Sequence, residues 1–159
     1  MVWIRSASKR SITIRAEREQ LHALLVDVVA CGRLMPGVEE LEAIGDRLYH
    51  YRLAKVSTGV VTFTPDYESR FHTADPDAIS WEPHGEHNFK SWGTFRISDG
   101  PGAGELSLEI DTRAEASVDV NRVVVMLIEP FAKRESDKVT EGFLAAIRDA
   151  VETRYVEAR

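Results

Sequence analysis

The closest pair of metal-ligating side chains in this sequence is His84 and His87, separated by Gly85 and Glu86. Two imidazole groups can bind zinc, and Glu86 or Asp77 would add a carboxylate oxygen. The pair lies outside any helical pattern and lacks the glutamate that acts as general base in zinc proteases. We therefore interpret this segment as a polar loop between two strands and expect neither a metal site nor a cofactor.

Aromatic residues with polar tips are the second candidates for chemistry. A tyrosine in a pocket offers contact area and a hydroxyl group that can form a hydrogen bond to a ligand. Tyr51 and Tyr67 lie in the middle of predicted strands, on the apolar face, so we expect both to face a cavity. Trp81 lies on the same predicted wall, where core packing is its simplest role.

Nucleophilic catalysis finds no support in the sequence. Cys31 has no neighbouring base or charge cluster that would lower the pKa of its thiol, so we expect it to be structural. The serines lack the flanking glycines of a nucleophile elbow. The glycine-rich run from Gly100 to Gly104 joins two strands, unlike a phosphate-binding loop that opens a helix. No inward carboxylate is predicted on the strands between Tyr49 and Ile110, so we predict no catalytic residue.

Composition narrows the class of protein. The 159 residues suit one domain, residues 1–159, whose core is large enough to need no disulfide or metal. With 20 basic and 26 acidic residues, the net charge of −6 argues against nucleic acid and anionic membrane surfaces as partners. The single cysteine favours a reducing compartment, and the longest apolar run, Val123–Ile128, is too short to span a membrane. We therefore expect a cytoplasmic protein.

Alternating polar and apolar residues predict a long series of strands with hairpin-like turns between them, and hence an antiparallel sheet. Pro65 falls inside one of them and predicts an edge position or a bulge there. The predicted strands are Ser11–Arg15, Val38–Ile44, Leu48–Val56, Val60–Thr73, a segment around Ile79 and Trp81, Lys90–Ile97 and Glu105–Ala116.

Helical spacing of apolar residues appears before and after these strands. It predicts a helix over Glu17–Val29, with a short further turn at Ala30–Leu34, and a long helix over Ser136–Thr153. Pro130 predicts a break, because proline removes a hydrogen bond inside a helix. The run Lys133–Lys138 is mixed in sign and is interpreted as a solvated helix face.

These elements predict an α+β fold in which a curved antiparallel sheet of six or seven strands wraps around a long C-terminal helix. Such a helix-grip arrangement buries the apolar faces of both elements. It also leaves an apolar space between them, which is a natural ligand pocket.

The sequence resembles the START-like, or SRPBCC, superfamily, also called the birch-pollen-allergen-like or polyketide cyclase/dehydrase group. The resemblance covers about Ser11–Glu152, and its spacing is closest to the branch named for carbon-monoxide dehydrogenase. The stretch Leu24–Tyr51 matches an entry helix, a Pro-Gly turn and the following strand, and a weaker match follows. The matching residues are Leu25, Asp27, Leu34, Met35-Pro36-Gly37-Val38, Leu41, Ile44-Gly45-Asp46 and Tyr49, then Trp81, Gly93-Thr94-Phe95 and Leu106–Ile110.

The resemblance implies a helix-grip domain with a pocket, and the superfamily includes binders as well as enzymes, so it does not fix the function. Many proteins of the carbon-monoxide-dehydrogenase branch carry a C-terminal anchor that this sequence lacks, so we expect no stable membrane insertion. Our leading interpretation is binding of a small apolar or amphipathic molecule, with no protein partner identified. The predicted ligand-binding residues are Tyr51, Leu53, Phe63, Tyr67, Trp81, Phe95, Leu108, Ile110, Leu127 and Phe131, with Val124 and Phe143 completing the lid.

Two alternatives remain open. In a cyclase/dehydratase-type enzyme, Tyr51, Tyr67 or His84 would position or protonate a polyketide-like substrate. In a protein-interaction module, the cavity would be filled by side chains and an apolar patch would be exposed.

Overall fold

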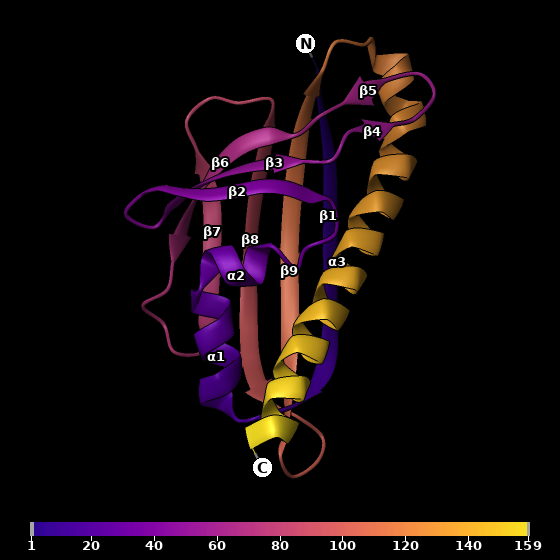
Figure 1. Ribbon diagram of the computed structural model, residues 1–159. Coiled ribbons are helices and arrows are strands. Elements are labelled where there is room, and N and C mark those ends of the chain that lie inside the picture. Colours follow the sequence, from indigo (N-terminus) through magenta and orange to yellow (C-terminus); the bar gives the residue numbers. More distant parts are fainter. Residues whose placement is uncertain (1, 159) are drawn as a thin grey trace.

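The computed structural model describes the backbone of residues 2–158 and the side chains of residues 2–154. A curved sheet lies on one side of the long C-terminal helix, and two short helices close one end (Figure 1). The strands are β1 (Val2–Arg15), β2 (Val38–Gly45), β3 (Leu48–Leu53), β4 (Val56–Ser57), β5 (Thr62–Phe63), β6 (Asp66–His72), β7 (Ala78–His84), β8 (Phe89–Asp99) and β9 (Glu105–Val118). The helices are α1 (Arg18–Val26), α2 (Val28–Gly32) and α3 (Arg122–Ala158).

The main sheet has seven strands in the order β1-β9-β8-β7-β6-β3-β2, and every neighbouring pair is antiparallel. A separate two-stranded ribbon joins β4 to β5. No helix lies between Val38 and Ala116 in this part of the chain. The α+β helix-grip architecture predicted from the sequence is therefore confirmed.

Strand β1 is much longer than the predicted segment Ser11–Arg15, because it begins at Val2 and pairs with β9 along its whole length. The prediction missed its first half because Ser6 and Ser8 face inward, where alternation would place apolar residues. Ser8 is buried among hydrogen bonds to α3, which offset the cost of burying its hydroxyl group.

The predicted strand Val60–Thr73 is wrong as a single element, since the chain turns a corner at Thr64 and Pro65 between β5 and β6. Asn88 holds this corner with two hydrogen bonds. Its side-chain carbonyl accepts from the amide of Asp66 at 3.0 Å, and its amide donates to the carbonyl of Thr64 at 2.9 Å. Proline cannot donate to a ladder, which explains why the strand is interrupted there.

The predicted helix Glu17–Val29 is divided at Asp27 into α1 and α2. The side chain of Asp27 accepts a hydrogen bond from the amide of Ala30 at 3.2 Å, so it caps the start of α2. Gly32 ends α2 under the sheet. A β-carbon at that position would lie 2.4 Å from Leu41, so only glycine allows this close approach.

The predicted break at Pro130 is also wrong, because α3 continues through it. Pro130 is exposed, as is Met126, the residue whose carbonyl group loses its helical partner to the proline. Water can satisfy that carbonyl, while residues on both sides of Pro130 pack against the sheet. Asn121 caps the helix start by accepting a hydrogen bond from the amide of Val124 at 3.0 Å.

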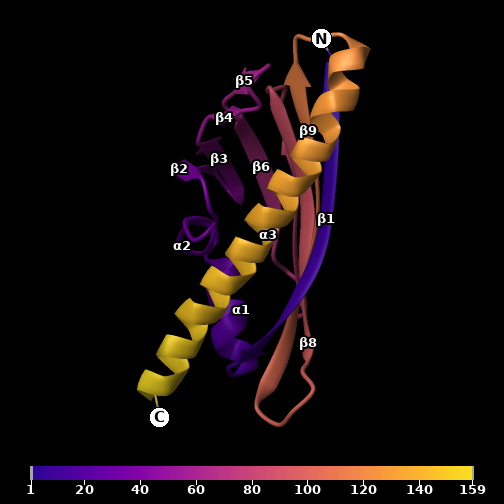
Figure 2. The same cartoon turned by 90° about the vertical axis from the view of Figure 1, so that its right-hand side faces the viewer.

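Helix α3 runs obliquely across the concave side of the sheet, next to β1 (Figure 2). Polar contacts join the two elements: Ser8 Oγ donates to Asp137 at 2.6 Å, and Lys133 Nζ donates to the carbonyl of Ala7 at 2.8 Å. Arg10 also pairs with Asp137 and Glu141, at 3.4 and 3.2 Å. We call this set of contacts the β1–α3 seam.

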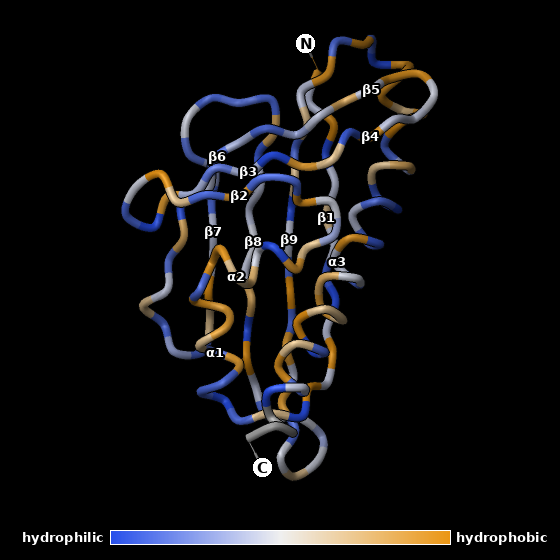
Figure 3. The backbone as a smooth tube through the Cα atoms, viewed as in Figure 1, coloured by the Kyte–Doolittle hydropathy of each residue, from blue (hydrophilic) through white to orange (hydrophobic). Residues whose placement is uncertain are grey.

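Apolar residues alternate along the strands and recur at helical spacing along α3 (Figure 3). The predicted inward register is confirmed, since Tyr67, Phe95, Leu108 and Ile110 are buried and Phe63 is half-buried. A large core joins α1, the C-terminal half of α3 and the sheet, and a smaller cluster lies where α3 begins.

Candidate functional site

A cavity of about 260 Å³ lies between α3 and the concave face of the sheet. Its floor comes from the inward side chains of β3, β6, β7, β8, β9 and β1. Cys31, Gly32 and Met35 close one end after α2, and Val61 and Phe63 of the β4–β5 ribbon close the other. The walls are overwhelmingly apolar. The volume lies a little below the roughly 300–1,000 Å³ usual for small-molecule sites.

The cavity is open because small side chains occupy neighbouring positions on three strands. The register places Ala114 of β9 between Ser6 of β1 and Ser91 of β8, so one row across the sheet carries only small residues. Further along the same strands, Leu108 stands between Ile12 and Ile97, and there the space is filled. Large residues at one end and small ones at the other leave an empty volume under the first half of α3.

Aromatic rings cover much of the floor in two series. Tyr51 and Tyr67 stack at 5.1 Å between ring centroids, and Tyr67 meets Phe89 at 4.8 Å. In the second series, Trp81 lies between Phe71 and Phe95, at 5.7 and 5.4 Å. Such rings give a ligand large, rigid contact surfaces that lose little conformational entropy on binding.

Trp81 lies flat over Gly93, its partner on β8. A β-carbon at Gly93 would lie 2.0 Å from the indole ring, so glycine is required for this packing. The indole N–H of Trp81 donates to the hydroxyl of Ser91 at 2.9 Å, which satisfies its only polar atom. Trp81 therefore offers the cavity an apolar ring and no free donor.

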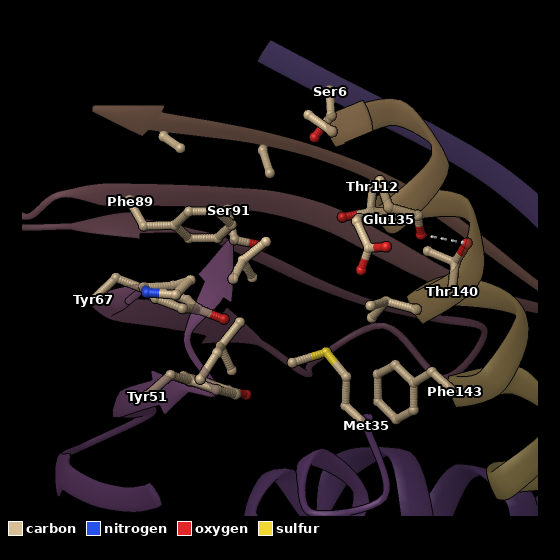
Figure 4. A pocket seen from close by; sticks show the side chains of 18 of the residues that line it. Ser6, Met35, Tyr51, Tyr67, Phe89, Ser91, Thr112, Glu135, Thr140 and Phe143 are labelled. Atoms are coloured by element: carbon tan, nitrogen blue, oxygen red, sulfur yellow. Dashed lines mark hydrogen bonds between the residues drawn. The ribbon is translucent and has the colours of Figure 1, made fainter. Parts of the chain in front are cut away.

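Polar groups without protein partners also face the cavity. Ser69 is 1% exposed, and its hydroxyl has no hydrogen-bond partner in the described part of the chain. The hydroxyls of Tyr51 and Tyr67 likewise form no hydrogen bond with any described residue, and Figure 4 shows them turned into the same space. Burial raises the pKa of Tyr67, and burial together with the neighbouring Tyr67 and Cys31 raises the pKa of Tyr51 well above its usual value. Both phenols are neutral at physiological pH.

Glu135 is the only charged residue among the described residues that line the cavity. It projects from α3 between Ala132 and Val139, and Figure 4 shows its carboxylate pointing toward the space that the tyrosine hydroxyls face. Within residues 2–154 it forms no ion pair or hydrogen bond, although its neighbour Asp137 is engaged in the β1–α3 seam. The cavity thus combines apolar walls, neutral hydroxyls and one carboxylate.

The structure brings most of the predicted ligand-binding residues together around this cavity. Eight of them line it, namely Tyr51, Leu53, Phe63, Tyr67, Trp81, Phe95, Ile110 and Phe131, and Phe143 of the predicted lid does too. Two of them do not line it. Leu108 is fully buried beneath the helix in the packed core, where neighbouring side chains fill the space.

Leu127 is the clearer correction, since it is 73% exposed on the outer side of α3 together with Val123 and Met126. The predicted stripe of Val120, Val123, Val124 and Leu127 assumed a helix that stops before Pro130. The continuous helix instead turns Val125 and Ile128 toward the sheet. Val124 does not line the cavity either and packs in the smaller cluster near the helix start.

The remaining sequence candidates lie elsewhere. His84 and His87 stand outside the cavity lining, and His87 is 3.4 Å from Glu68. Asp77 pairs with Arg18 at 2.8 Å. The described residues contain no group of three or more His, Cys, Asp or Glu side chains that could hold a metal ion. Cys31 is buried at the cavity wall, and burial raises the pKa of its thiol to about 12, so it is not a thiolate at neutral pH.

Sequence reasoning missed Ser69 and Glu135. Ser69 could have been found, because it lies between Tyr67 and Phe71 on the inward face of the same strand. Glu135 was hidden in the charged run Lys133–Lys138, which looks like a solvated helix face. Helical spacing from Ile128 and Phe131 would have placed it toward the cavity, had the helix been predicted to pass Pro130.

Comparison with known proteins gives a fold and no name. No family model matches the sequence, and no curated protein matches it closely enough to be significant. None of the described helices is long and apolar enough to cross a membrane.

Solved structures, by contrast, are similar over nearly the whole chain. A START superfamily protein from Mycobacterium smegmatis has a TM-score of 0.67 at 14% identity, over 92% of this chain and 97% of its own. Norcoclaurine synthase from Thalictrum flavum, as a point mutant with a transition-state analogue, gives 0.62 at 16%, over 99% and 98%.

The di-domain ARO/CYC StfQ of the steffimycin biosynthetic pathway gives a TM-score of 0.63 at 12% identity, over 95% of this chain and 52% of that one. Identities this low establish the fold alone, so the finer placement near the carbon-monoxide-dehydrogenase branch stays a prediction. Together with the seven-stranded sheet and the long helix, these similarities establish that the chain has the START-like helix-grip fold.

Proposed function

We propose that this protein binds a small apolar or amphipathic molecule in the cavity between α3 and the sheet. The observation that carries the proposal is an apolar, aromatic-lined volume that the protein's own side chains leave empty. The uncovered hydroxyl of Ser69 adds to it, because a buried polar group without a partner costs about 1–3 kcal/mol that a ligand or water can recover. The cytoplasm is the proposed location, on the ground of the single cysteine.

Similar structures lend support, since the norcoclaurine synthase structure holds a transition-state analogue in the same fold. The proposed contacts are the cavity-lining aromatic residues, above all the stacked pair Tyr51 and Tyr67. An empty apolar site of this kind gains affinity mainly from burying the ligand's apolar surface. The polar groups then fix its orientation.

The test combines native mass spectrometry of the purified chain with titration of a neutral fluorescent probe, N-phenylnaphthylamine. We expect a co-purifying molecule or saturable binding of one probe per chain. Tyr67→Ala should weaken probe binding about tenfold, equivalent to about 1.4 kcal/mol, because a stacking surface is lost. Tyr49→Ala is the matched control, since Tyr49 lies on the same strand as Tyr51 but outside the lining. Absence of both a co-purifying molecule and saturable probe binding would refute the proposal.

A cyclase/dehydratase-type enzyme is a second candidate, favoured by the Glu135 carboxylate that faces the tyrosine hydroxyls. A carboxylate can accept a proton while a nearby phenol donates a hydrogen bond to a developing oxyanion. Turnover of a polyketide-like substrate that is lost in both Glu135→Gln and Tyr67→Phe, with the fold intact, would establish this candidate. His84 has no part in it, because its side chain does not line the cavity.

A further inference from the structure

The charge distribution of the cavity is one-sided. Its described lining contains Glu135 but no lysine, arginine or histidine. The cations nearest in sequence are engaged or turned away: Lys133 pairs with Asp137 at 2.8 Å, and Arg134 and Lys138 are exposed. No described residue is therefore placed to neutralise an anionic group on a bound ligand.

Glu135 itself lacks a partner, unlike the acidic residues that follow it on the inner side of α3. Asp137 is bound by Ser8, Lys133 and Arg10, and Glu141 by Arg10. A partly buried carboxylate without a counter-charge or donor costs free energy, and the cost grows as a ligand displaces water around it. A ligand that supplies a donor at this point would remove that cost.

A second observation points to a ligand in the same space. Ser69 is almost completely buried, lines the cavity and has no hydrogen-bond partner in residues 2–154. Together with the neutral hydroxyls of Tyr51 and Tyr67, it offers hydrogen bonds but no positive charge. Neutral hydroxyl groups suit an alcohol, a phenol or an amine, whereas a carboxylate, sulfonate or phosphate would meet a like charge on Glu135.

We infer that the cavity selects amphiphiles whose polar end is neutral or a protonated amine, and that Glu135 excludes anionic ones such as fatty acids. This inference rests on the proposed binding function and adds the chemical class of the ligand. Like charges brought together in a poorly solvated site cost enough to separate these classes by at least about tenfold in affinity.

Two probes that differ by one group test it directly. N-phenylnaphthylamine is neutral, and anilinonaphthalenesulfonate is the same skeleton with a sulfonate. We expect the wild-type protein to bind the neutral probe at least about tenfold more tightly. Glu135→Gln should reduce this ratio several-fold by improving sulfonate binding. Glu129→Gln removes the same charge from an exposed position of α3 and should leave the ratio unchanged.

A displacement series in the wild-type protein makes the test independent of any variant. Decanol and decylamine should displace the neutral probe, whereas decanoate should not, and the first two arms separate a neutral donor from a cationic one. Equal binding of both probes, displacement by decanoate, or an unchanged ratio in folded Glu135→Gln would overturn the selectivity while leaving the binding function intact. If the neutral probe does not bind at all, the binding function itself fails, and the selectivity fails with it.

Discussion

The two halves of α3 face the same sheet in opposite ways. Its C-terminal half packs solidly, with Ile147 and Val151 fully buried against Ile14 and Leu21 in one core. Its first half carries Ala132, Ser136 and Val139 along the edge of the cavity. The helix is continuous, so the difference arises from side-chain size and not from a change in backbone direction.

This difference shows how the fold can hold a space open. The β1–α3 seam fixes the distance between helix and strand by polar contacts, so the helix cannot collapse onto the small side chains of the Ser6–Ala114–Ser91 row. Apolar packing at the other end supplies the stability. A cavity in such a place is a consequence of composition along three strands, and each half can be tested separately.

The largest expected effect comes from truncating matched isoleucines in the two halves. Ile147→Ala should lower the free energy of unfolding by about 4 kcal/mol, since it leaves a new void in a packed core. Ile128→Ala removes the same atoms from the cavity wall and should cost about 2 kcal/mol, because little new void is created. Urea unfolding of the two variants measures the difference. Equal losses would mean that the cavity is closed in solution.

The seam provides the next largest effect. Ser8→Ala removes a buried hydroxyl that bonds Asp137 and Thr140 at 2.6 and 2.9 Å, so we expect a loss of about 1–2 kcal/mol in unfolding free energy. Ser6→Ala, two residues away on the same face, should change it by less than about 0.5 kcal/mol, because Ser6 only borders the cavity. A comparable loss in both variants, measured by urea unfolding, would contradict a structural role confined to the seam.

Most of the fold could be predicted from the sequence, because strand alternation and helical spacing report directly on which face is buried. The failures have local causes. Pro130 predicts a break only when propensity is weighed without the packing on either side of it. The first half of β1 was missed because its inward residues Ser6 and Ser8 are polar, and only the contacts of Ser8 with α3 explain a buried hydroxyl there.

The candidate site was harder to predict than the fold. The inward strand residues could be read from alternation, but the openness of the cavity depends on which residues share a row across the sheet, such as Ala114 with Ser6 and Ser91. Row partners follow from strand register, which is set by the whole sheet. Glu135 and Leu127 were misplaced together, because both depend on the rotational phase of α3 past Pro130.

Filling the hollow half should raise stability slightly while removing function. Ala114→Leu places a larger side chain in the centre of the row of small residues, so we expect up to about 1 kcal/mol more unfolding free energy. Binding of N-phenylnaphthylamine should weaken at least about tenfold. Ala43→Leu, on the exposed edge strand β2, controls for added apolar surface. Unchanged probe binding in Ala114→Leu would show that the probe binds outside this cavity.

The smallest expected effect is the pH dependence of the seam. Hydrogen bonds from Lys133 and Ser8 lower the pKa of Asp137 below its usual value. The folded state therefore favours the ionised carboxylate, and its contribution to stability is present above the unfolded pKa of about 3.9. It is lost as the pH falls through the lower, folded pKa. Asp137→Asn should accordingly flatten the acid limb of the stability profile, measured by urea unfolding between neutral pH and pH ~3. Asp111→Asn, at an exposed position of β9, should leave that limb unchanged. An acid limb that is identical in all three proteins would mean that the seam holds α3 by shape and hydrogen bonding alone, without a contribution from charge.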